Sequence, residues 1–160
     1  MKRAVRRRSA QRGIAAVEFA LVLGLLVVLL HGISTFGAAL YIQQAVSRAA
    51  EDGARAAPLL PAQMMKTSPA AAMEQIRGAV RESLAGSLVV PSTGQLTEVQ
   101  RRGWIASYVP ISVVALNLQV TVTVSYPYGQ NRLLPALPLV DASRWLPQVL
   151  TSRATAVLPS

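Results

Sequence analysis

The sequence predicts an α+β protein in which a long N-terminal transmembrane helix continues into a small domain built from a helix and an antiparallel sheet. Three features predict this class: an unbroken apolar run near the N-terminus, an alanine-rich stretch without proline directly after it, and a later segment of strictly alternating apolar and polar residues. A chain of 160 residues has room for an anchor and one small domain.

Residues 1–13 form a basic leader. It holds six of the sixteen basic residues, and without it ten basic and seven acidic residues remain, a net charge of +3. A nucleic-acid-binding protein spreads its basic residues over a face of its folded domain, whereas these residues precede an apolar segment. We therefore expect no nucleic-acid partner, and we expect the leader to lie on the cytoplasmic side of a membrane.

Residues 14–42 are predicted to form the transmembrane helix. From Phe19 to Leu30 every residue is apolar or glycine, and apolar character continues to Ile42. The segment is about 43 Å long at 1.5 Å per residue. A hydrocarbon core of about 30 Å needs about 20 residues, so one tilted helix can span it. Everything after about residue 42 then lies outside the inner membrane.

Two other interpretations stay open at this point. A cleavable secretory signal also has a basic start, but its apolar region is about 7–15 residues, and the run here is longer and contains Glu18. Small residues at Ala45 and Ala49-Ala50 could still imitate a signal-peptidase site. The second alternative is an uncut single-pass anchor with an adaptor or sensor domain.

Residues 43–57 are expected to continue the helix outside the membrane, because they are rich in helix formers and lack proline. Glu51 and Arg55 are spaced for an i,i+4 ion pair, and Pro58 and Pro61 end the run. Small residues recur at four-residue spacing and could let another helix approach closely, although alanine-rich helices also contain such spacings by chance. They are Ala16, Ala20, Gly24, Ala45, Ala49, Gly53 and Ala57.

Residues 58–160 are predicted to form the small α+β domain. A helix is expected at residues 69–87, with Pro69 in its first turn and Gly86 at its end. Its apolar stripe is Met73, Ile76, Val80 and Leu84. A turn is expected at residues 91–94, which read Pro-Ser-Thr-Gly.

The strongest strand pattern covers residues 111–126, with apolar residues at every second position from Leu116 to Tyr126. We expect a shorter strand at residues 104–109 and a closing strand at residues 150–158. The closing strand should bury Leu150, Ala154, Ala156 and Leu158 opposite Arg153 and Thr155. Residues 133–145 are expected to form a loop over the sheet.

The residue types argue against an enzyme. The chain has no cysteine, its one histidine (His31) lies in the apolar run, and Asp141 has no second acid at a useful spacing. We therefore expect no catalytic residues, no metal site and no cofactor. His31 is expected to face a protein neighbour or the outer leaflet, and Arg101, Arg102 and Arg144 to be solvated. Trp104 and Trp145 fit either a core or an interfacial belt.

Glu18 is the most informative residue, because a carboxylate inside a membrane segment costs on the order of 2.5–3.5 kcal/mol on insertion scales. Cleavage after Gly13 would give Ile14 an α-amine at i,i+4 from Glu18 and place the acid near the positive end of the helix dipole. In an assembly, the carboxylate could reach the amine of a neighbouring subunit. The alternative is an interfacial glutamate that extends to the cytoplasmic headgroups.

The segment at residues 13–57, roughly a quarter of the chain, resembles the TadE-like family, the minor pilins or pseudopilins of tight-adherence (Flp) pili. The likeness rests on Gly13-Ile14-Ala15-Ala16-Val17-Glu18-Phe19 in the span, and on Tyr41–Val46 and Ala49–Ala57 after it. The chain departs from the family's pattern at Gly24, where proline is common, and near Thr35, where an acid is common.

The resemblance implies a type IV prepilin-like site that a prepilin peptidase cuts between Gly13 and Ile14, with Glu18 and Phe19 as the processing and assembly motif. It implies pilin and other pseudopilin subunits, the inner-membrane assembly platform and membrane lipid as partners. The expected location is the bacterial inner membrane, single-pass, with a cytoplasmic N-terminus and a periplasmic C-terminal domain.

Overall fold

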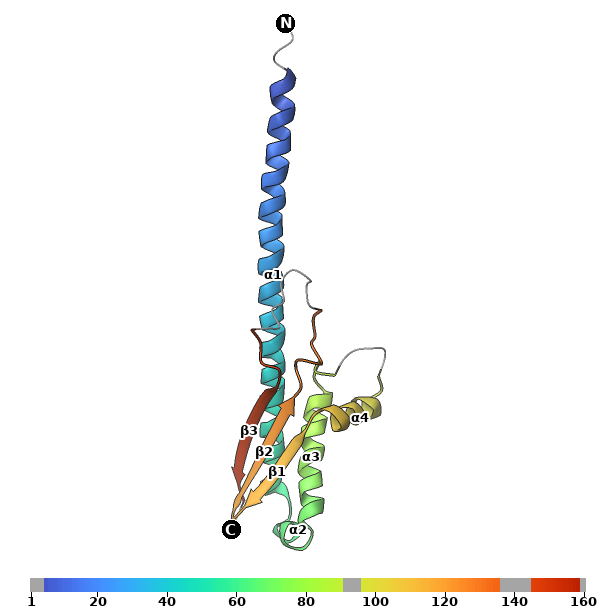
Figure 1. Cartoon of the computed structure of the whole chain (residues 1–160). Coiled ribbons are helices and arrows are strands. Elements are labelled where there is room, and N and C mark those ends of the chain that lie inside the picture. Colours follow the sequence, from blue (N-terminus) through green and yellow to red (C-terminus); the bar gives the residue numbers. More distant parts are fainter. Residues whose placement is uncertain (1–4, 91–95, 136–144, 159–160) are drawn as a thin grey trace.

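The computed structural model describes residues 5–90, 96–135 and 145–158. The expected turn at residues 91–94, together with Asp141, Arg144 and most of the expected loop at residues 133–145, lies outside the described residues. A single long helix extends well beyond a small body of helices and strands (Figure 1). The elements in chain order are α1 (Val5–Ala56), η1 (Ala57–Leu59), α2 (Ala62–Thr67), α3 (Pro69–Ala85), α4 (Glu98–Tyr108), β1 (Ile111–Leu116), β2 (Gln119–Tyr126) and β3 (Leu150–Val157).

Helix α1 confirms the long N-terminal helix and has two different halves. It begins at Val5, so it also takes in most of the leader, and it gives way to a 3₁₀ turn that contains Pro58. Its side chains from Gly13 to Leu30 are exposed, and its first buried residue is Ala39. The ion pair predicted between Glu51 and Arg55 is present, with 3.5 Å between the charged atoms.

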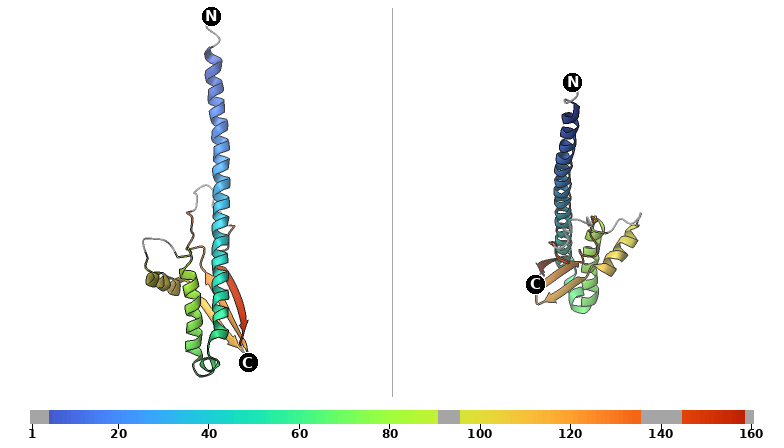
Figure 2. Two further views of the ribbon diagram at one scale, coloured as in Figure 1. Left: turned by 180° about the vertical axis from the view of Figure 1, so that it is seen from behind. Right: turned by 45° about the horizontal axis from the view of Figure 1, so that its top comes forward.

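The C-terminal half of α1 packs against both other layers of the body. It contacts α3, β2 and β3. Both views in Figure 2 show the sheet and α3 beside the C-terminal end of α1. In α3 the predicted residues Ile76, Val80 and Leu84 are fully buried, Met73 is half-buried, and Ala72 completes the buried face. The prediction of an antiparallel sheet packed on helices is confirmed.

The single strand expected at residues 111–126 is wrong, because the segment is a hairpin. Strand β1 pairs antiparallel with β2, Leu116 opposite Gln119, leaving Asn117 and Leu118 as a two-residue turn. Asn117 has φ of 55°, a left-handed conformation that asparagine tolerates better than most residues. Leu116 and Leu118, expected to be buried, are exposed, while Val120 through Tyr126 alternate as predicted.

The short strand expected at residues 104–109 is also wrong, since this segment belongs to helix α4. Thr97 and Gln100 form a capping box at its start, each side chain bonding the other residue's backbone N–H. Ile105 is buried, and the Trp104 and Tyr108 rings stack one turn apart at 5.1 Å. The aromatic and β-branched residues that suggested a strand serve instead as the packing face of a helix.

The closing strand is confirmed as β3, which pairs antiparallel with β2 and completes the order β1-β2-β3. Leu150 is buried, Ala154, Ala156 and Leu158 are half-buried, and Arg153 and Thr155 are exposed, which is the predicted division of faces. On the outer face, hydroxyl pairs join the two strands, such as Thr121 with Thr155 at 3.1 Å.

Candidate functional site

The candidate processing site lies within the regular part of α1. Gly13 and Ile14 follow eight residues after the helix start at Val5, and both are exposed. The sequence before Gly13 carries Arg6, Arg7, Arg8 and Arg12. Removal of residues 1–13 would replace this arrangement with a free amine at Ile14.

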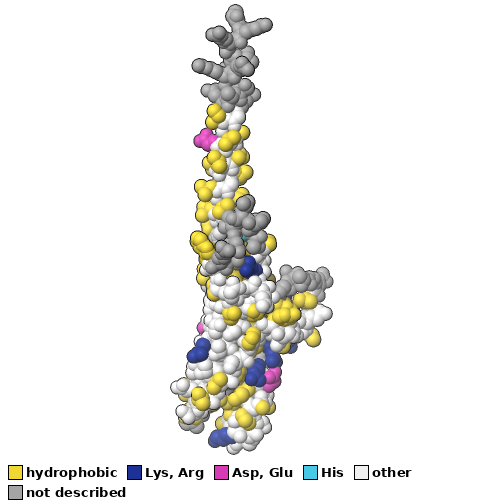
Figure 3. All heavy atoms as spheres, in the orientation of Figure 1, with side chains coloured by type: hydrophobic (Ala, Val, Ile, Leu, Met, Phe, Trp, Pro, Cys, Tyr) yellow, Lys and Arg dark blue, Asp and Glu magenta, His cyan; other side chains and the backbone are white. Residues whose placement is uncertain are grey.

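Glu18 lies on the same face of α1 as the candidate cleavage site. Gly13, Ile14, Val17, Glu18 and Leu21 together line this exposed face. The space-filling view shows an acidic side chain within an otherwise apolar upper helix (Figure 3). No lysine or arginine occurs between Ile14 and Ser47, so the span itself supplies no cation for Glu18. An amine on Ile14 would stand one helical turn away.

The small residues expected to favour helix packing fall into two groups. Ala16, Ala20 and Gly24 are exposed on the upper half of α1, whereas Ala49, Gly53 and Ala57 are buried and Ala45 is half-buried. A Cβ atom built on Gly53 would overlap Val80 Cγ2 of α3 and lie 3.3 Å from Val122 Cγ1 of β2. Glycine at residue 53 thus lets α3 and the sheet approach α1 closely.

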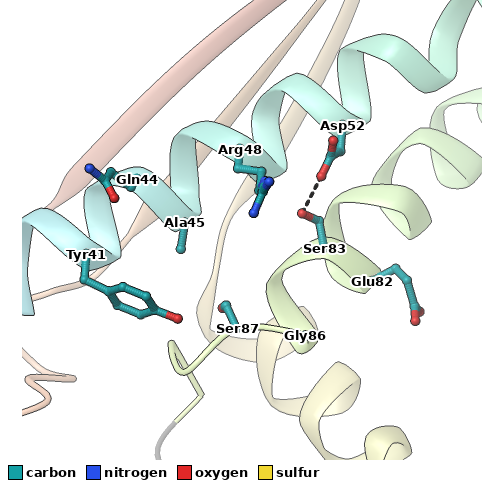
Figure 4. A pocket seen from close by; sticks show the side chains of 9 residues that line it. All are labelled: Tyr41, Gln44, Ala45, Arg48, Asp52, Glu82, Ser83, Gly86 and Ser87. Atoms are coloured by element: carbon teal, nitrogen blue, oxygen red, sulfur yellow. Dashed lines mark hydrogen bonds between the residues drawn. The ribbon is translucent and has the colours of Figure 1, made fainter.

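A second candidate site is a groove of about 590 Å³ between α1 and the C-terminal end of α3. Figure 4 shows Arg48 directed into it, beside Asp52 and Ser83. The Ser83 hydroxyl donates to an Asp52 carboxylate oxygen at 2.6 Å, and the Tyr41 hydroxyl accepts from the Leu88 backbone N–H at 3.1 Å. The groove is open and has both polar and apolar walls, and sequence reasoning did not find it, because its residues are distant in the chain.

The remaining predicted residues lie as follows. His31 is half-buried. Its backbone carbonyl accepts a hydrogen bond from the Thr35 hydroxyl at 2.8 Å, so the Thr35 hydroxyl has a partner within the helix. Arg102 is exposed and lies 2.6 Å from Glu82, whereas Arg101 is half-buried and donates to the Ser87 carbonyl. Trp104 packs against the core, and Trp145 is 82% exposed.

The arrangement offers little for chemistry within the described residues. No group of three or more His, Cys, Asp or Glu side chains that could hold a metal ion occurs among them.

Comparison with known proteins bears on the N-terminal segment. The model of the family described as "TadE-like protein" matches residues 13–55, the segment in which the resemblance was found. No curated protein and no solved structure matches the chain. The matched family is a structural pilus-component family, and the described chain has one helix, Gly13–Leu59, long and apolar enough to cross a membrane. The segment from Gly13 to Arg55 thus matches the TadE-like family, which points to a protein associated with the tight-adherence pilus.

Proposed function

We propose that this chain is a minor pilin or pseudopilin-like structural component of the tight-adherence pilus apparatus, made from a precursor by prepilin peptidase. The observation that carries the proposal is the family match over residues 13–55, which begins at Gly13 and includes Glu18. In this proposal the chain is a substrate of the peptidase and performs no catalysis itself.

The placement of Glu18 supports cleavage after Gly13. A lone carboxylate in a membrane helix is costly, and no lysine or arginine occurs from Ile14 to Ser47. An α-amine on Ile14 would form an ion pair at i,i+4, and the carboxylate would lie near the helix N-terminus, where a negative charge contributes about 0.3–1 kcal/mol. Cleavage also removes the arginines of residues 6–8 from the start of α1.

The architecture supports a role in assembly. The exposed apolar half of α1 suits lipid or the helices of other subunits, with Ala16, Ala20 and Gly24 as points of close approach. The body at its other end would lie in the periplasm. Pilin and pseudopilin subunits and the inner-membrane platform are the partners proposed for these surfaces.

The N-terminus of the protein recovered from native membranes tests the proposal. Processing predicts the sequence Ile-Ala-Ala-Val-Glu, starting at Ile14. An intact start at Met1 would support the uncut anchor with an adaptor or sensor domain. A start near residue 50 would support a secretory signal.

A charge substitution tests assembly separately. Glu18→Ala should abolish incorporation or pilus formation while the protein still inserts into the membrane. Glu51→Ala is the matched control, because Glu51 is an acid on the same helix whose ion pair with Arg55 is solvent-exposed. Normal pilus formation by Glu18→Ala would contradict the assembly role of this residue.

A further inference from the structure

At most about one and a half turns of α1 separate the predicted membrane span from the outer body. If Glu18 lies at the cytoplasmic headgroups, about 20 residues of helix cross the hydrocarbon core and reach its outer boundary near Ala38. If Ile14 lies there instead, the boundary falls near Ile33. The first buried residue of α1 is Ala39, so the body begins to pack on the helix between about one and six residues after this boundary.

Hydrogen bonds show which parts of the body lie at this level. The backbone N–H of Leu88 donates to the Tyr41 hydroxyl at 3.1 Å, and Gln43 Nε2 donates to the Thr151 carbonyl at 3.3 Å. Strand β3 runs away from the membrane from Leu150 onward, so residues 145–149 lie on its membrane side. Figure 1 shows this dark red segment rising beside α1 toward its N-terminal half.

The segment that follows β2 also extends from the body toward the membrane. Residues 127–135 extend from the end of β2 alongside α1 (Figure 1). The backbone N–H of Gly129 donates to the carbonyl of Gln148 at 2.9 Å, which ties this segment to the one before β3. Among the residues that the structure describes, the two segments and the residues after α3 therefore form the edge of the body nearest the bilayer.

This edge carries large apolar side chains that the body leaves uncovered. We name Leu88, Leu133, Trp145 and Val149 the membrane-proximal rim; they are 68%, 36%, 82% and 51% exposed. Phe36 and Leu40, at this level of α1, are exposed as well, so the apolar surface of the span continues to the level of the rim. A tryptophan exposed at this depth suits the membrane–water interface, where its ring and its N–H both find partners.

From this placement we propose that the rim rests in the outer headgroup region of the bilayer, with Trp145 as its interfacial anchor. Lipid is the occupant because the rim adjoins the lipid-facing part of α1 at the level where the helix leaves the hydrocarbon. Contact at this second place, beside α1, fixes the tilt of the body relative to the membrane. The inference requires α1 to span a membrane but not cleavage after Gly13, so an uncut N-terminus refutes the proposed function and leaves this inference intact.

Tryptophan quenching by brominated lipid tests the inference on the full chain in lipid nanodiscs. Trp104→Phe leaves Trp145 as the single tryptophan. Its emission should be blue-shifted and should fall by about half when the lipid chains are brominated near the headgroup, as expected for an interfacial ring. Iodide in the aqueous phase should quench it only weakly.

Two further single-tryptophan variants provide the controls, both made in a Trp104→Phe, Trp145→Phe background. Leu25→Trp lies in the middle of the span and should be quenched by lipid brominated deep in the chain. Val157→Trp lies at the far end of β3, at a position that is 65% exposed, and should respond to iodide only. This pair shows that the method separates lipid contact from simple exposure.

Two results would overturn the inference. The first is a result in which brominated lipid quenches the tryptophan of Leu25→Trp, but no brominated lipid quenches Trp145 in the Trp104→Phe variant. If Trp145 is then shielded from iodide, a protein partner covers the rim; if iodide reaches it, the rim is bare. The second is the absence of lipid quenching in both Leu25→Trp and the variant that retains Trp145. That result would contradict the membrane span of α1 and the contact of the rim with lipid together. Should Trp104→Phe lower the melting temperature, a spin label on Trp145→Cys, in a chain without other cysteines, reports the same depth through oxygen accessibility.

Discussion

At the scale of single residues, Gly53 determines how closely the layers of the body can approach. A Cβ atom at this position would overlap Val80 Cγ2, and both residues are buried. Alanine usually stabilises a helix relative to glycine by up to about 1 kcal/mol. Here we expect the cost of the steric overlap to exceed this gain in helix propensity, since overpacking costs about 1–3 kcal/mol.

We therefore expect Gly53→Ala to lower the melting temperature of the full chain in detergent, followed by circular dichroism. Gly78→Ala is the matched control, because Gly78 lies within α3 and a Cβ atom there meets nothing within 4 Å. The control should be neutral or stabilising. Equal effects of the two substitutions would contradict the close approach at Gly53.

Tyr126 joins three segments through one buried hydroxyl group. Its oxygen lies 3.0 Å from the Val89 carbonyl and 3.1 Å from the Asn131 carbonyl, so the proton is shared between two acceptors. Burial raises the pKa of Tyr126 to about 12, and the neighbouring Tyr128 adds to the shift. The sequence predicted that Tyr126 is buried, but the acceptors come from parts of the chain that no periodicity relates to it.

The shifted pKa predicts a loss of stability at alkaline pH. The unfolded pKa of tyrosine is about 10, so the neutral phenol contributes its full stability below pH 10, and the contribution is lost as the pH rises through about 12. Chemical denaturation between pH 9 and 12 should show stability falling by up to about 2 kcal/mol from this group, at about 1.4 kcal/mol per pKa unit.

Tyr126→Phe is the comparison for this measurement. It removes the titrating group, so its stability should fall less steeply with pH, even though its stability at neutral pH is lower because two carbonyl groups lose their donor. Tyr128, whose pKa burial also raises, remains in both proteins. Parallel pH profiles would refute the assignment to Tyr126.

At the scale of elements, a two-residue turn decides the topology of the sheet. The alternating pattern continues through Asn117 and Leu118 without a break, because a hairpin with a two-residue turn preserves the period of two. The structure reverses the chain there, with Asn117 at φ 55°. Turn residues of this kind favour asparagine and glycine, and this was the signal that the periodicity concealed.

The turn predicts different outcomes for two substitutions of Asn117. Asn117→Val should destabilise the protein by about 1–2 kcal/mol, because a β-carbon disfavours the left-handed conformation and a branched one does so most. Asn117→Gly should be close to neutral, since glycine adopts this conformation freely. The melting temperatures of the two variants in detergent provide the measurement, and equal values would contradict the turn geometry.

Helix α4 shows a second limit of local patterns. Its residues 104–109 include tryptophan, isoleucine, tyrosine and valine, which favour strands when considered alone. The capping box formed by Thr97 and Gln100 is visible in the sequence and marks a helix start. The packing of Ile105 into the core and of Trp104 near Tyr126, 6.4 Å between ring centroids, then stabilises the helix.

At the scale of the whole molecule, α1 has two roles in one continuous helix. Its N-terminal half has the length and composition of a membrane span, and its C-terminal half supplies a face of the core of the body. The buried residues of that face are Ala39, Ile42, Val46, Ala49, Ala50, Gly53 and Ala54, and Ala57 of η1 follows them. The membrane span and this part of the core therefore belong to one continuous helix.

The shared helix predicts which fragment of the chain can fold. A fragment that starts at residue 58 lacks the α1 face, so the inner sides of α3 and β2 would be exposed and the fragment should not fold cooperatively. A fragment that starts at residue 37 retains this face and should fold. Near-ultraviolet circular dichroism and thermal unfolding distinguish the two, and cooperative unfolding of the shorter fragment would contradict the role of α1 in the core.

The sequence by itself determined the features that depend on neighbours along the chain. These are the apolar span, the helix through residue 56, the helix α3 with its buried stripe, the alternation of β2 and β3, and the segment at residues 13–55 that the family matches. Each follows from a period or composition that local chemistry imposes.

Only the tertiary structure decided the features that depend on residues distant in the chain. These features are the reversal at Asn117, the helical state of residues 98–108, the contact of Gly53 with Val80 and the hydrogen bond between Leu88 and Tyr41. All of them depend on which surfaces meet. Periodicity indicates that a side chain is buried but not what buries it, because the same apolar face can pack against a helix, a sheet or lipid.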